Sequence, residues 1–254
     1  MNLSFLDQVL SRSSVRNFTN TPVELPTLTK LLECAQRAPT SGFMQSWSVL
    51  VITDPLLKEK LIQDNYCIGC VDGQNVKMLR SPSPYLIWLA DLRRNKILLD
   101  KKDISTNDYV SKADFHLKAI CDATIAAQTF CLAAESIGIG TCYMGTIREI
   151  TWSYWNEMFG LGKHVFPLFG TAIGYPDKLN DSAKKFRTRL PQSNVVHYNQ
   201  YNDVNNVADY NQIYANSKAR FASFEEQLRE RVGNVGRTKL EISSSLRDAG
   251  FTFE

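Results

Sequence analysis

Two arginines and two hydroxyl groups lie close together near the start of the chain. Arg12 and Arg16 flank Ser13, Ser14 and Val15, directly after a segment whose apolar residues have helical spacing. Arginine binds phosphate through forked, charge-assisted hydrogen bonds, and a hydroxyl can donate one more. The segment therefore favours phosphate binding. The alternative is a solvated helix end that pairs with surface carboxylates.

A second group of cations comes much later in the sequence. Lys184, Lys185, Arg187 and Arg189 place four positive charges within six residues. Such a run suits an anion, a nucleic acid or plain solvation. If this loop folded against residues 12–16, the two groups together would form a strong phosphate site.

The segment from residue 38 to residue 48 joins a predicted helix to a predicted buried strand and is rich in polar groups. Thr40 supplies a hydroxyl, Gln45 an amide and Phe43 an aromatic ring. Gly42 would let a ligand come close to the backbone. We expect either a loop that contacts a ligand or an ordinary turn around a packed tryptophan.

A shorter motif joins another predicted strand to a helix. Met144, Gly145 and Thr146 occupy the turn. The first backbone N–H groups of a helix have no partner inside the helix, so they can bind an anion. Alone, the motif does not separate a binding site from a structural turn.

The elements that would position these residues follow from hydrophobic spacing. Helical spacing covers 3–10, 28–35, 55–62, 111–137, 147–158 and much of 221–253, and apolar runs indicate strands at 48–53, 85–90, 141–144 and 165–174. The polar stretch 92–109 is predicted as a loop or surface insertion. Because strands and helices alternate without a strict βαβ rhythm, the predicted fold class is α+β.

Composition excludes several classes of protein. The 254 residues include 29 Lys plus Arg and 26 Asp plus Glu, a net charge of +3, which argues against a dedicated nucleic-acid binder. An apolar share of 44% with 22% charged residues is typical of a globular protein. No apolar run is long enough to span a membrane, and the first ten residues lack the basic start of a secretory signal. We therefore expect a cytoplasmic protein without nucleic-acid or membrane partners.

Neither cysteine nor histidine spacing predicts a metal centre or a nucleophilic site. Cys67 and Cys70 form a Cys-x-x-Cys pair, a redox signature that here lies outside a βαβ unit. A thiol oxidoreductase built on this pair stays open as an alternative. The other four cysteines are not spaced as zinc ligands, so no metal is expected and the thiols should be reduced and mostly buried. The three histidines are expected to be structural.

Several motifs occur in a defined order along the chain. They are Arg12-x-Ser-x-Arg16, Ala38-Pro-Thr-Ser-Gly-Phe-Met-Gln45, Gly73-Gln74, Glu135-Ser-Ile-Gly-Ile-Gly-x-x-Tyr-Met-Gly145, Pro167-Leu-Phe-Gly-x-x-x-Gly-Tyr-Pro176 and Arg187-Thr-Arg-Leu-Pro191. The ordered set resembles the nitroreductase family, and within it the NADPH-dependent flavin oxidoreductases and oxygen-insensitive nitroreductases. The resemblance covers roughly residues 5–191 and continues more weakly to the C-terminus.

The resemblance implies a nitroreductase-like α+β fold, with a central, mostly antiparallel sheet flanked by helices in an intertwined homodimer. Residues 1–191 would form the FMN-binding core, and residues 192–254 would wrap the partner subunit and contribute to the nucleotide site. The implied cofactor-binding positions are Arg12, Ser13, Ser14, Val15, Arg16, Thr40, Gln45, Gln74, Met144, Gly145, Thr146, Arg187 and Arg189. The implied substrate or NADPH positions are Phe43, Arg148, Lys218, Arg220, Arg237 and Lys239.

The resemblance also implies an activity. The protein would be an FMN-dependent NAD(P)H oxidoreductase that passes two electrons, by a ping-pong hydride mechanism, to nitroaromatics, quinones or free flavin. FMN would be bound, and NADPH would be the electron donor, with NADH also possible. The flavin would carry the chemistry, so no amino acid is expected to be catalytic. A non-catalytic flavin- or anion-binding module is the rival from another class, because the same phosphate motifs would serve it.

Overall fold

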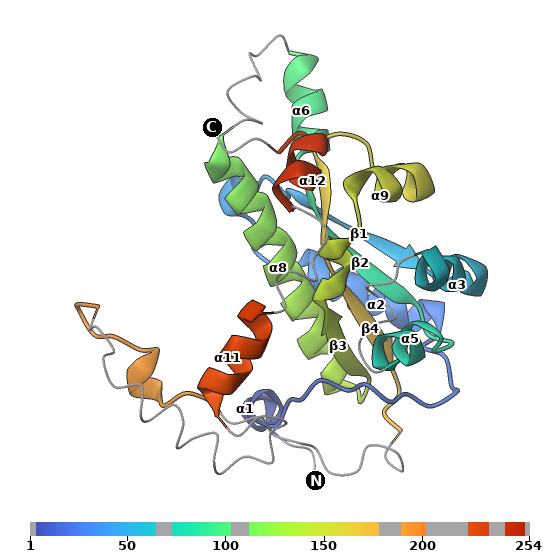
Figure 1. The fold of residues 1–254 in the computed structure, drawn as a ribbon, viewed down its shortest axis with the longest axis vertical. Helices are drawn as coiled ribbons and strands as arrows, with labels where there is room; N and C mark the ends of the chain where they lie inside the picture. The colour runs from blue at the N-terminus through green and yellow to red at the C-terminus, as the bar shows by residue number, and fades with distance from the viewer. Residues whose placement is uncertain are drawn as a thin grey trace. The chain divides into compact units, whose positions relative to one another are not determined.

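The computed structural model describes residues 4–64, 73–102, 112–177, 189–201, 223–233 and 242–251. The chain forms two compact units, residues 1–182 with 240–254 and residues 183–239. The first unit contains a sheet with helices on both faces (Figure 1). The second contains η3 (Gln192–Asn194) and α11 (Phe224–Gly233).

The described strands of the first unit form one antiparallel sheet. Its order is β1 (Trp47–Ile52), β2 (Tyr85–Asp91), β4 (Val165–Gly174) and β3 (Gly140–Met144). The central strands β2 and β4 are buried at nearly every position, as their unbroken apolar sequences predict for strands covered on both faces. The predicted α+β fold with a mostly antiparallel sheet is confirmed.

One face of the sheet is covered by α8 (Ala113–Ser136) and α2 (Leu25–Gln36), as Figure 1 shows. The buried side of α8 is rich in alanine, and these small side chains let the helix approach the sheet closely. Trp88 of β2 packs edge-on against Phe130 of α8, and its ring nitrogen donates a hydrogen bond of 3.0 Å to the hydroxyl of Thr171. Helix α8 is long and apolar enough to cross a membrane by composition, a test that core helices of soluble proteins also pass.

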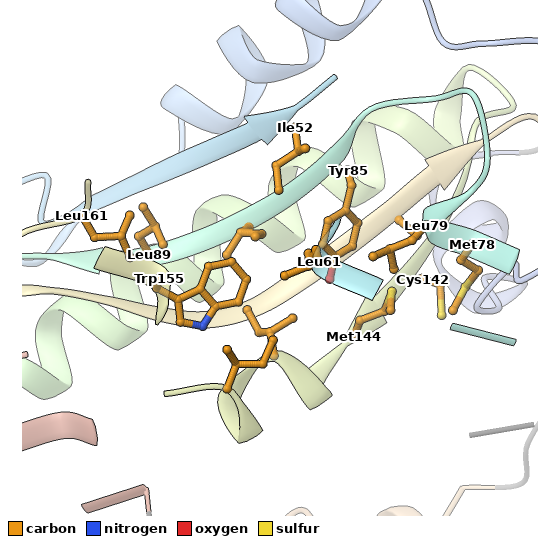
Figure 2. Close-up of a cluster of buried hydrophobic side chains, with 14 of the residues drawn as sticks. Ile52, Leu61, Met78, Leu79, Tyr85, Leu89, Cys142, Met144, Trp155 and Leu161 are labelled. Atoms are coloured by element: carbon orange, nitrogen blue, oxygen red, sulfur yellow. The ribbon is translucent and has the colours of Figure 1, made fainter. Parts of the chain in front are cut away.

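The opposite face is covered by α3 (Pro55–Asp64), α5 (Gln74–Leu79) and α9 (Trp152–Phe159). Figure 2 shows how their side chains Leu61, Met78 and Trp155 pack with Tyr85 of β2 and Met144 of β3. Apolar side chains thus fill both faces, and the sheet lies between two layers of helices.

The prediction of a loop at 92–109 is wrong for its first part, because α6 occupies Arg93–Asp100. The helix starts where the carboxylate of Asp91 accepts the backbone N–H of Arg93 at 3.1 Å. Lys96 and Asp100 then form an ion pair one turn apart at 2.8 Å. None of its residues is buried, so an apolar stripe that would reveal the helix in the sequence is missing. Residues 103–111 lie outside the described residues.

The first unit also contains shorter elements, among them the 3-10 turn η1 (Ser41–Phe43). The N-terminal helix α1 (Phe5–Leu10) begins with Ser4, whose hydroxyl accepts the backbone N–H of Asp7 at 3.2 Å. The predicted helix 147–158 is divided into a 3-10 turn, η2 (Gly145–Glu149), and α9. The division falls at Thr151, the N-cap of α9.

The last described helix, α12 (Ile242–Asp248), packs against α9 in the first unit. The hydroxyl of Ser245 accepts the backbone N–H of Trp152 at 3.1 Å, and Phe251 is buried just beyond the helix. Part of the stretch after residue 191 therefore folds onto its own chain. The domain boundary at residue 191 stays a prediction. The same holds for the contact of residues 192–254 with a partner subunit.

The described cysteines are all free. Cys131 and Cys142 are buried, Cys34 is partly exposed and Cys121 is exposed. Cys67 and Cys70, the pair on which the thiol alternative depends, lie outside the described residues.

Candidate functional site

The phosphate motif lies along the edge strand of the sheet. The backbone N–H of Val15 donates to the carbonyl of Thr141 in β3 at 2.9 Å, and that of Thr19 donates to the carbonyl of Tyr175 at 2.8 Å. Gly140 lies under the motif, where an added Cβ would come within 2.7 Å of the Val15 side chain. Glycine at this position lets residues 12–16 lie flat against β3.

The first arginine of the motif is already paired. The guanidinium of Arg12 donates from Nε to Oε2 of Glu135 at 3.3 Å and from Nη2 to Oε1 at 3.1 Å. The same Oε1 accepts the hydroxyl of Thr141 at 2.7 Å. Burial alone would lower the pKa of Arg12, but the hydrogen bond and charge of Glu135 outweigh it and raise that pKa. Arg12 therefore ties the motif to the end of α8.

The second arginine has no acidic partner among the described residues. The recorded hydrogen bond of Arg16 goes from Nη1 to the carbonyl of Ser14, at 3.4 Å. Both residues lie beside Cys142: burial raises the pKa of that thiol, while the Arg16 charge and a hydrogen bond with Ser14 act against the rise. A half-buried guanidinium whose charge is not neutralised by a carboxylate fits a phosphate group.

The turn after β3 places three more predicted residues further along the same strand. Gly145 begins η2, and an added Cβ there would lie 3.1 Å from Nη2 of Arg148. Arg148 donates from Nη1 to the carbonyl of Leu168 in β4 at 2.8 Å, which fixes its side chain over the turn. The hydroxyl of Thr146 is buried without a hydrogen-bond partner in the described residues. Several other side-chain atoms of the described residues, the Tyr85 hydroxyl among them, are buried without a partner in the same way, so this hydroxyl does not by itself indicate a ligand.

Gln74 belongs to α5, which packs on the same face of the sheet as Ile147 of the turn at 145–148. It is the first residue of α5, directly after Gly73, whose φ of 65° needs glycine. Met78 and Leu79 of the same helix pack into one cluster with Cys142 and Met144 (Figure 2). The structure thus brings α5, the turn at 145–148 and the 12–16 motif to β3.

The remaining predicted contacts belong to residues 40–46, which we call the 40–46 loop. The hydroxyl of Thr40 accepts the backbone N–H of Gln45 at 3.3 Å. Phe43 and Gln45 both adopt left-handed backbone angles, with φ of 57° and 51°. The Phe43 side chain is 82% exposed. The loop is thus folded on itself and presents an aromatic ring to the outside.

Two residues that sequence reasoning missed support the 40–46 loop. Arg94 donates from Nη2 to the carbonyls of Gln45 at 2.9 Å and Trp47 at 2.7 Å. Asp122 of α8 is fully buried and accepts two backbone N–H groups of the loop. Arg94 was missed because 92–109 was predicted as a loop; an Arg-Arg-Asn run directly after a buried strand was the available signal. Asp122, a carboxylate in the middle of an alanine-rich helix, was visible in the sequence as a polar residue on the buried face.

The two parts of the predicted site lie at opposite ends of β4. The 12–16 motif bonds to Thr141, which pairs with Ile173 of β4. The 40–46 loop ends at Ser46, whose carbonyl accepts the N–H of Asp91, the partner of Val165. Eight residues of β-strand separate Val165 from Ile173, about 26 Å. One subunit therefore does not bring both parts of the predicted cofactor site together.

The structure does not place all of the predicted site residues at β3 or in the 40–46 loop. Arg187, Lys218, Arg220, Arg237 and Lys239 lie outside the described residues. Arg189 is described, but it belongs to the second compact unit.

Comparison with known proteins decides the family. The model of the nitroreductase family matches residues 9–175, which is more than half of the chain. The chain belongs to the nitroreductase family. Members of the nitroreductase family bind FMN and use NAD(P)H.

Relatives within the nitroreductase family are similar over most of their length. An FMN reductase (NADPH) of Bacillus subtilis is 32% identical over 78% of this chain and 74% of its own. A Cr(VI) reductase of a Pseudomonas species is 34% identical over 76% of this chain and 73% of its own. The solved structure of the NfrA1 nitroreductase from B. subtilis superposes with a TM-score of 0.82, at 27% identity, over 98% of this chain and 99% of the other.

Proposed function

We propose that this protein is a cytoplasmic, FMN-dependent NADPH oxidoreductase that passes two electrons to a small organic acceptor. The observation that carries the proposal is Arg16: a half-buried guanidinium without a carboxylate partner in the described residues, beside Ser14 on the strand that leads to Gly145 and Thr146. The relative named FMN reductase (NADPH) supports the flavin and the donor, and the relative named Cr(VI) reductase supports a reductase activity.

The 12–16 motif would hold the FMN phosphate, with different roles for its two arginines. Arg16, Ser13 and Ser14 would bind the phosphate directly. Arg12 would hold the motif in place through Glu135, as its two hydrogen bonds to that carboxylate indicate. Arg187 and Arg189 would supply further positive charge.

The turn at 145–148 would face the flavin ring. FMN, when bound, supplies the hydride chemistry between NADPH and the acceptor. The backbone N–H groups at the start of η2, near Gly145 and Thr146, and the cation of Arg148 would favour negative charge on the reduced cofactor. The proton that the reduced product takes up would come from water.

A complete site requires a second copy of the chain. Because the 12–16 motif and the 40–46 loop lie about 26 Å apart along β4, a two-fold homodimer would join the loop of one subunit to the motif of its partner. Exposed apolar residues on the unit's surface would form the interface. Those on α1 and along α8 with its C-terminal end are Phe5, Leu6, Leu10, Leu117, Ile125 and Ile137.

In this dimer, Phe43 and Gln45 would border the space above the ring, where nicotinamide and acceptor bind in turn. Because the nicotinamide must leave before the acceptor can bind in the same space, the kinetics would be ping-pong. Nitroaromatics, quinones and free flavin are the proposed acceptors. NADPH is the proposed donor, with NADH as a weaker one.

The test uses the purified full-length protein. We expect it to be yellow, to lose its colour when NADPH is added without oxygen, and to regain it when a nitroaromatic is added. Initial rates at several fixed acceptor concentrations should give parallel double-reciprocal plots. A yellow protein that neither NADPH nor NADH bleaches would identify a non-catalytic flavin module, and a protein that cannot take up FMN at all would refute the flavin proposal.

A further inference from the structure

The 40–46 loop has an unusual backbone for a surface segment. Gly42, Phe43 and Gln45 have φ of 56°, 57° and 51°, so three of its seven residues are left-handed and two of these carry side chains. Non-glycine residues keep such conformations only where surrounding contacts hold them. The contacts that hold this loop therefore decide its conformation.

Asp122 holds both ends of the loop from inside the protein. Its fully buried carboxylate accepts the backbone N–H of Ser41 at 2.8 Å through Oδ1 and that of Ser46 at 3.3 Å through Oδ2. These bonds satisfy the buried charge and fix the distance between the ends of the loop. They do not contact the residues between.

Arg94 binds the last part of the loop and the start of β1, which follows it. In addition to the carbonyls of Gln45 and Trp47, its guanidinium donates to the hydroxyl of Ser48 at 2.7 Å and to Oδ2 of Asp91 at 2.9 Å. The side chain of Asp91 is almost buried and itself accepts the Ser48 hydroxyl at 2.5 Å, so the guanidinium is fixed in one orientation. Only the planar fork of arginine reaches these acceptors at once.

The neighbouring residue of α6 adds one bond of the same kind. Asn95 donates from Nδ2 to the carbonyl of Met44 at 3.0 Å. Carbonyls of Met44, Gln45 and Trp47 are thus all bound by the first turn of α6. These bonds fix the backbone of the loop, whereas the Phe43 side chain is 82% exposed.

We propose that Arg94 is a positioning residue, which fixes the 40–46 loop so that Phe43 and Gln45 face the flavin site of the partner subunit and set the affinity for the electron acceptor. The inference rests on the proposed function. It adds a determinant of acceptor binding that touches neither the cofactor nor the acceptor. A loop whose backbone is fixed before binding loses less conformational freedom when the acceptor arrives, so a looser loop should bind the acceptor more weakly.

The experiment compares Arg94→Met, which keeps the bulk of the stem and removes all donors, with Arg94→Lys and the wild type. Arg93→Met is the matched control, because the Arg93 guanidinium donates to the carbonyl of Leu161 and has no recorded bond to the loop. Steady-state kinetics use nitrofurazone as the acceptor, and hydrogen exchange reports on backbone amides 41–47.

We expect Arg94→Met to raise the KM for nitrofurazone at least fivefold, to change the KM for NADPH less than twofold and to speed exchange in the loop at least tenfold. Arg94→Lys should fall between Arg94→Met and the wild type, and Arg93→Met should match the wild type. If Arg94→Met does not yield soluble protein, Arg94→Lys and Arg94→Gln are measured in the same way, and a raised acceptor KM with faster exchange is again expected.

Two outcomes overturn the inference. Unchanged exchange in the loop would show that Arg94 does not hold it. Faster exchange with an unchanged acceptor KM would show that the loop does not set acceptor binding, while the reductase assignment stands. Failure of the proposed function itself is visible separately, in a wild-type protein that NADPH does not bleach.

Discussion

Glu135 accepts two hydrogen bonds from Arg12 across 123 residues of sequence. Arg16, four residues after Arg12, instead donates a hydrogen bond to the carbonyl of Ser14. Two arginines of one motif therefore have different surroundings: the charge of Arg12 is neutralised inside the protein, whereas that of Arg16 is not neutralised by any described carboxylate.

Replacing Arg16 should weaken cofactor binding more than it affects folding. Arg16→Ala removes a charge-assisted partner of the phosphate, worth about 1.5–3 kcal/mol, or roughly a 10- to 100-fold weaker Kd for FMN. Quenching of flavin fluorescence during titration of the apoprotein measures this change. Unchanged FMN affinity would show that Arg16 does not hold the phosphate.

Replacing Arg12 should instead affect folding more than it weakens cofactor binding. Arg12→Ala leaves Glu135 partly buried without its partner, and the free energy of unfolding should fall by about 1–3 kcal/mol. The double variant Arg12→Ala/Glu135→Ala should lose less than the sum of the two single variants, because the two residues interact. Urea unfolding measures the cycle, and strict additivity would contradict the coupling.

Gly170 lies so close to the Tyr85 side chain that a larger residue at position 170 should destabilise the core. A Cβ at Gly170 would overlap the Tyr85 hydroxyl, which is buried and unpartnered within the described part of the chain. Gly170→Ala should therefore cost about 1–3 kcal/mol of stability. Tyr85→Phe should be neutral or stabilising by itself, and in the double variant it should recover only a small part of the loss, because its Cζ remains 2.3 Å from the added Cβ. Thermal unfolding tests both, and a Gly170→Ala protein as stable as the wild type would contradict the predicted overlap.

His164 predicts a loss of stability in acid. Burial lowers the pKa of His164, and the nearby charges of Lys96, His116 and Lys163 act in the same direction. Between this lowered pKa and the unfolded value of about 6.5, the unfolded chain binds more protons, so stability rises with pH. Unfolding in urea should therefore need less denaturant at pH 5.5 than at pH 7.5.

The matched variant for that measurement is His164→Asn. His164 has a φ of 65°, which asparagine tolerates better than most residues, and asparagine does not titrate. The slope of stability against pH should be smaller in this variant. The same slope in both proteins would assign the acid sensitivity to another group.

Where apolar sequence decides structure, the sequence predicted the fold well. The unbroken run Tyr85-Leu-Ile-Trp-Leu-Ala90 is a central strand because only a strand covered on both faces buries every side chain. Helix α6 was not predicted, because none of its residues is buried and the side-chain contacts recorded for it are polar: Asp91 accepts the N–H of Arg93, and Lys96 pairs with Asp100. Hydrophobic spacing therefore did not reveal this helix.

The sequence indicates residue types for a candidate site but not their arrangement. The arginines and serines of residues 12–16 suit a phosphate by charge and hydrogen bonding, but the segment alone does not separate that role from a solvated helix end. That Val15 and Ser46 attach near opposite ends of β4 depends on the pairing of β2, β3 and β4, which is a long-range property. The role of Arg94 depends on the same pairing, because β2 must end beside Trp47 before its next residues can reach the loop.

The separation along β4 has a consequence for mixed assemblies. In the proposed homodimer, a subunit with Arg16→Ala lacks only its own phosphate contact, and a subunit with Arg94→Met impairs only the site of its neighbour. A mixed dimer of the two therefore concentrates both defects in one site and leaves the other intact. The mixed dimer of the two variants would therefore keep one fully active site, whereas each variant's own homodimer would have none.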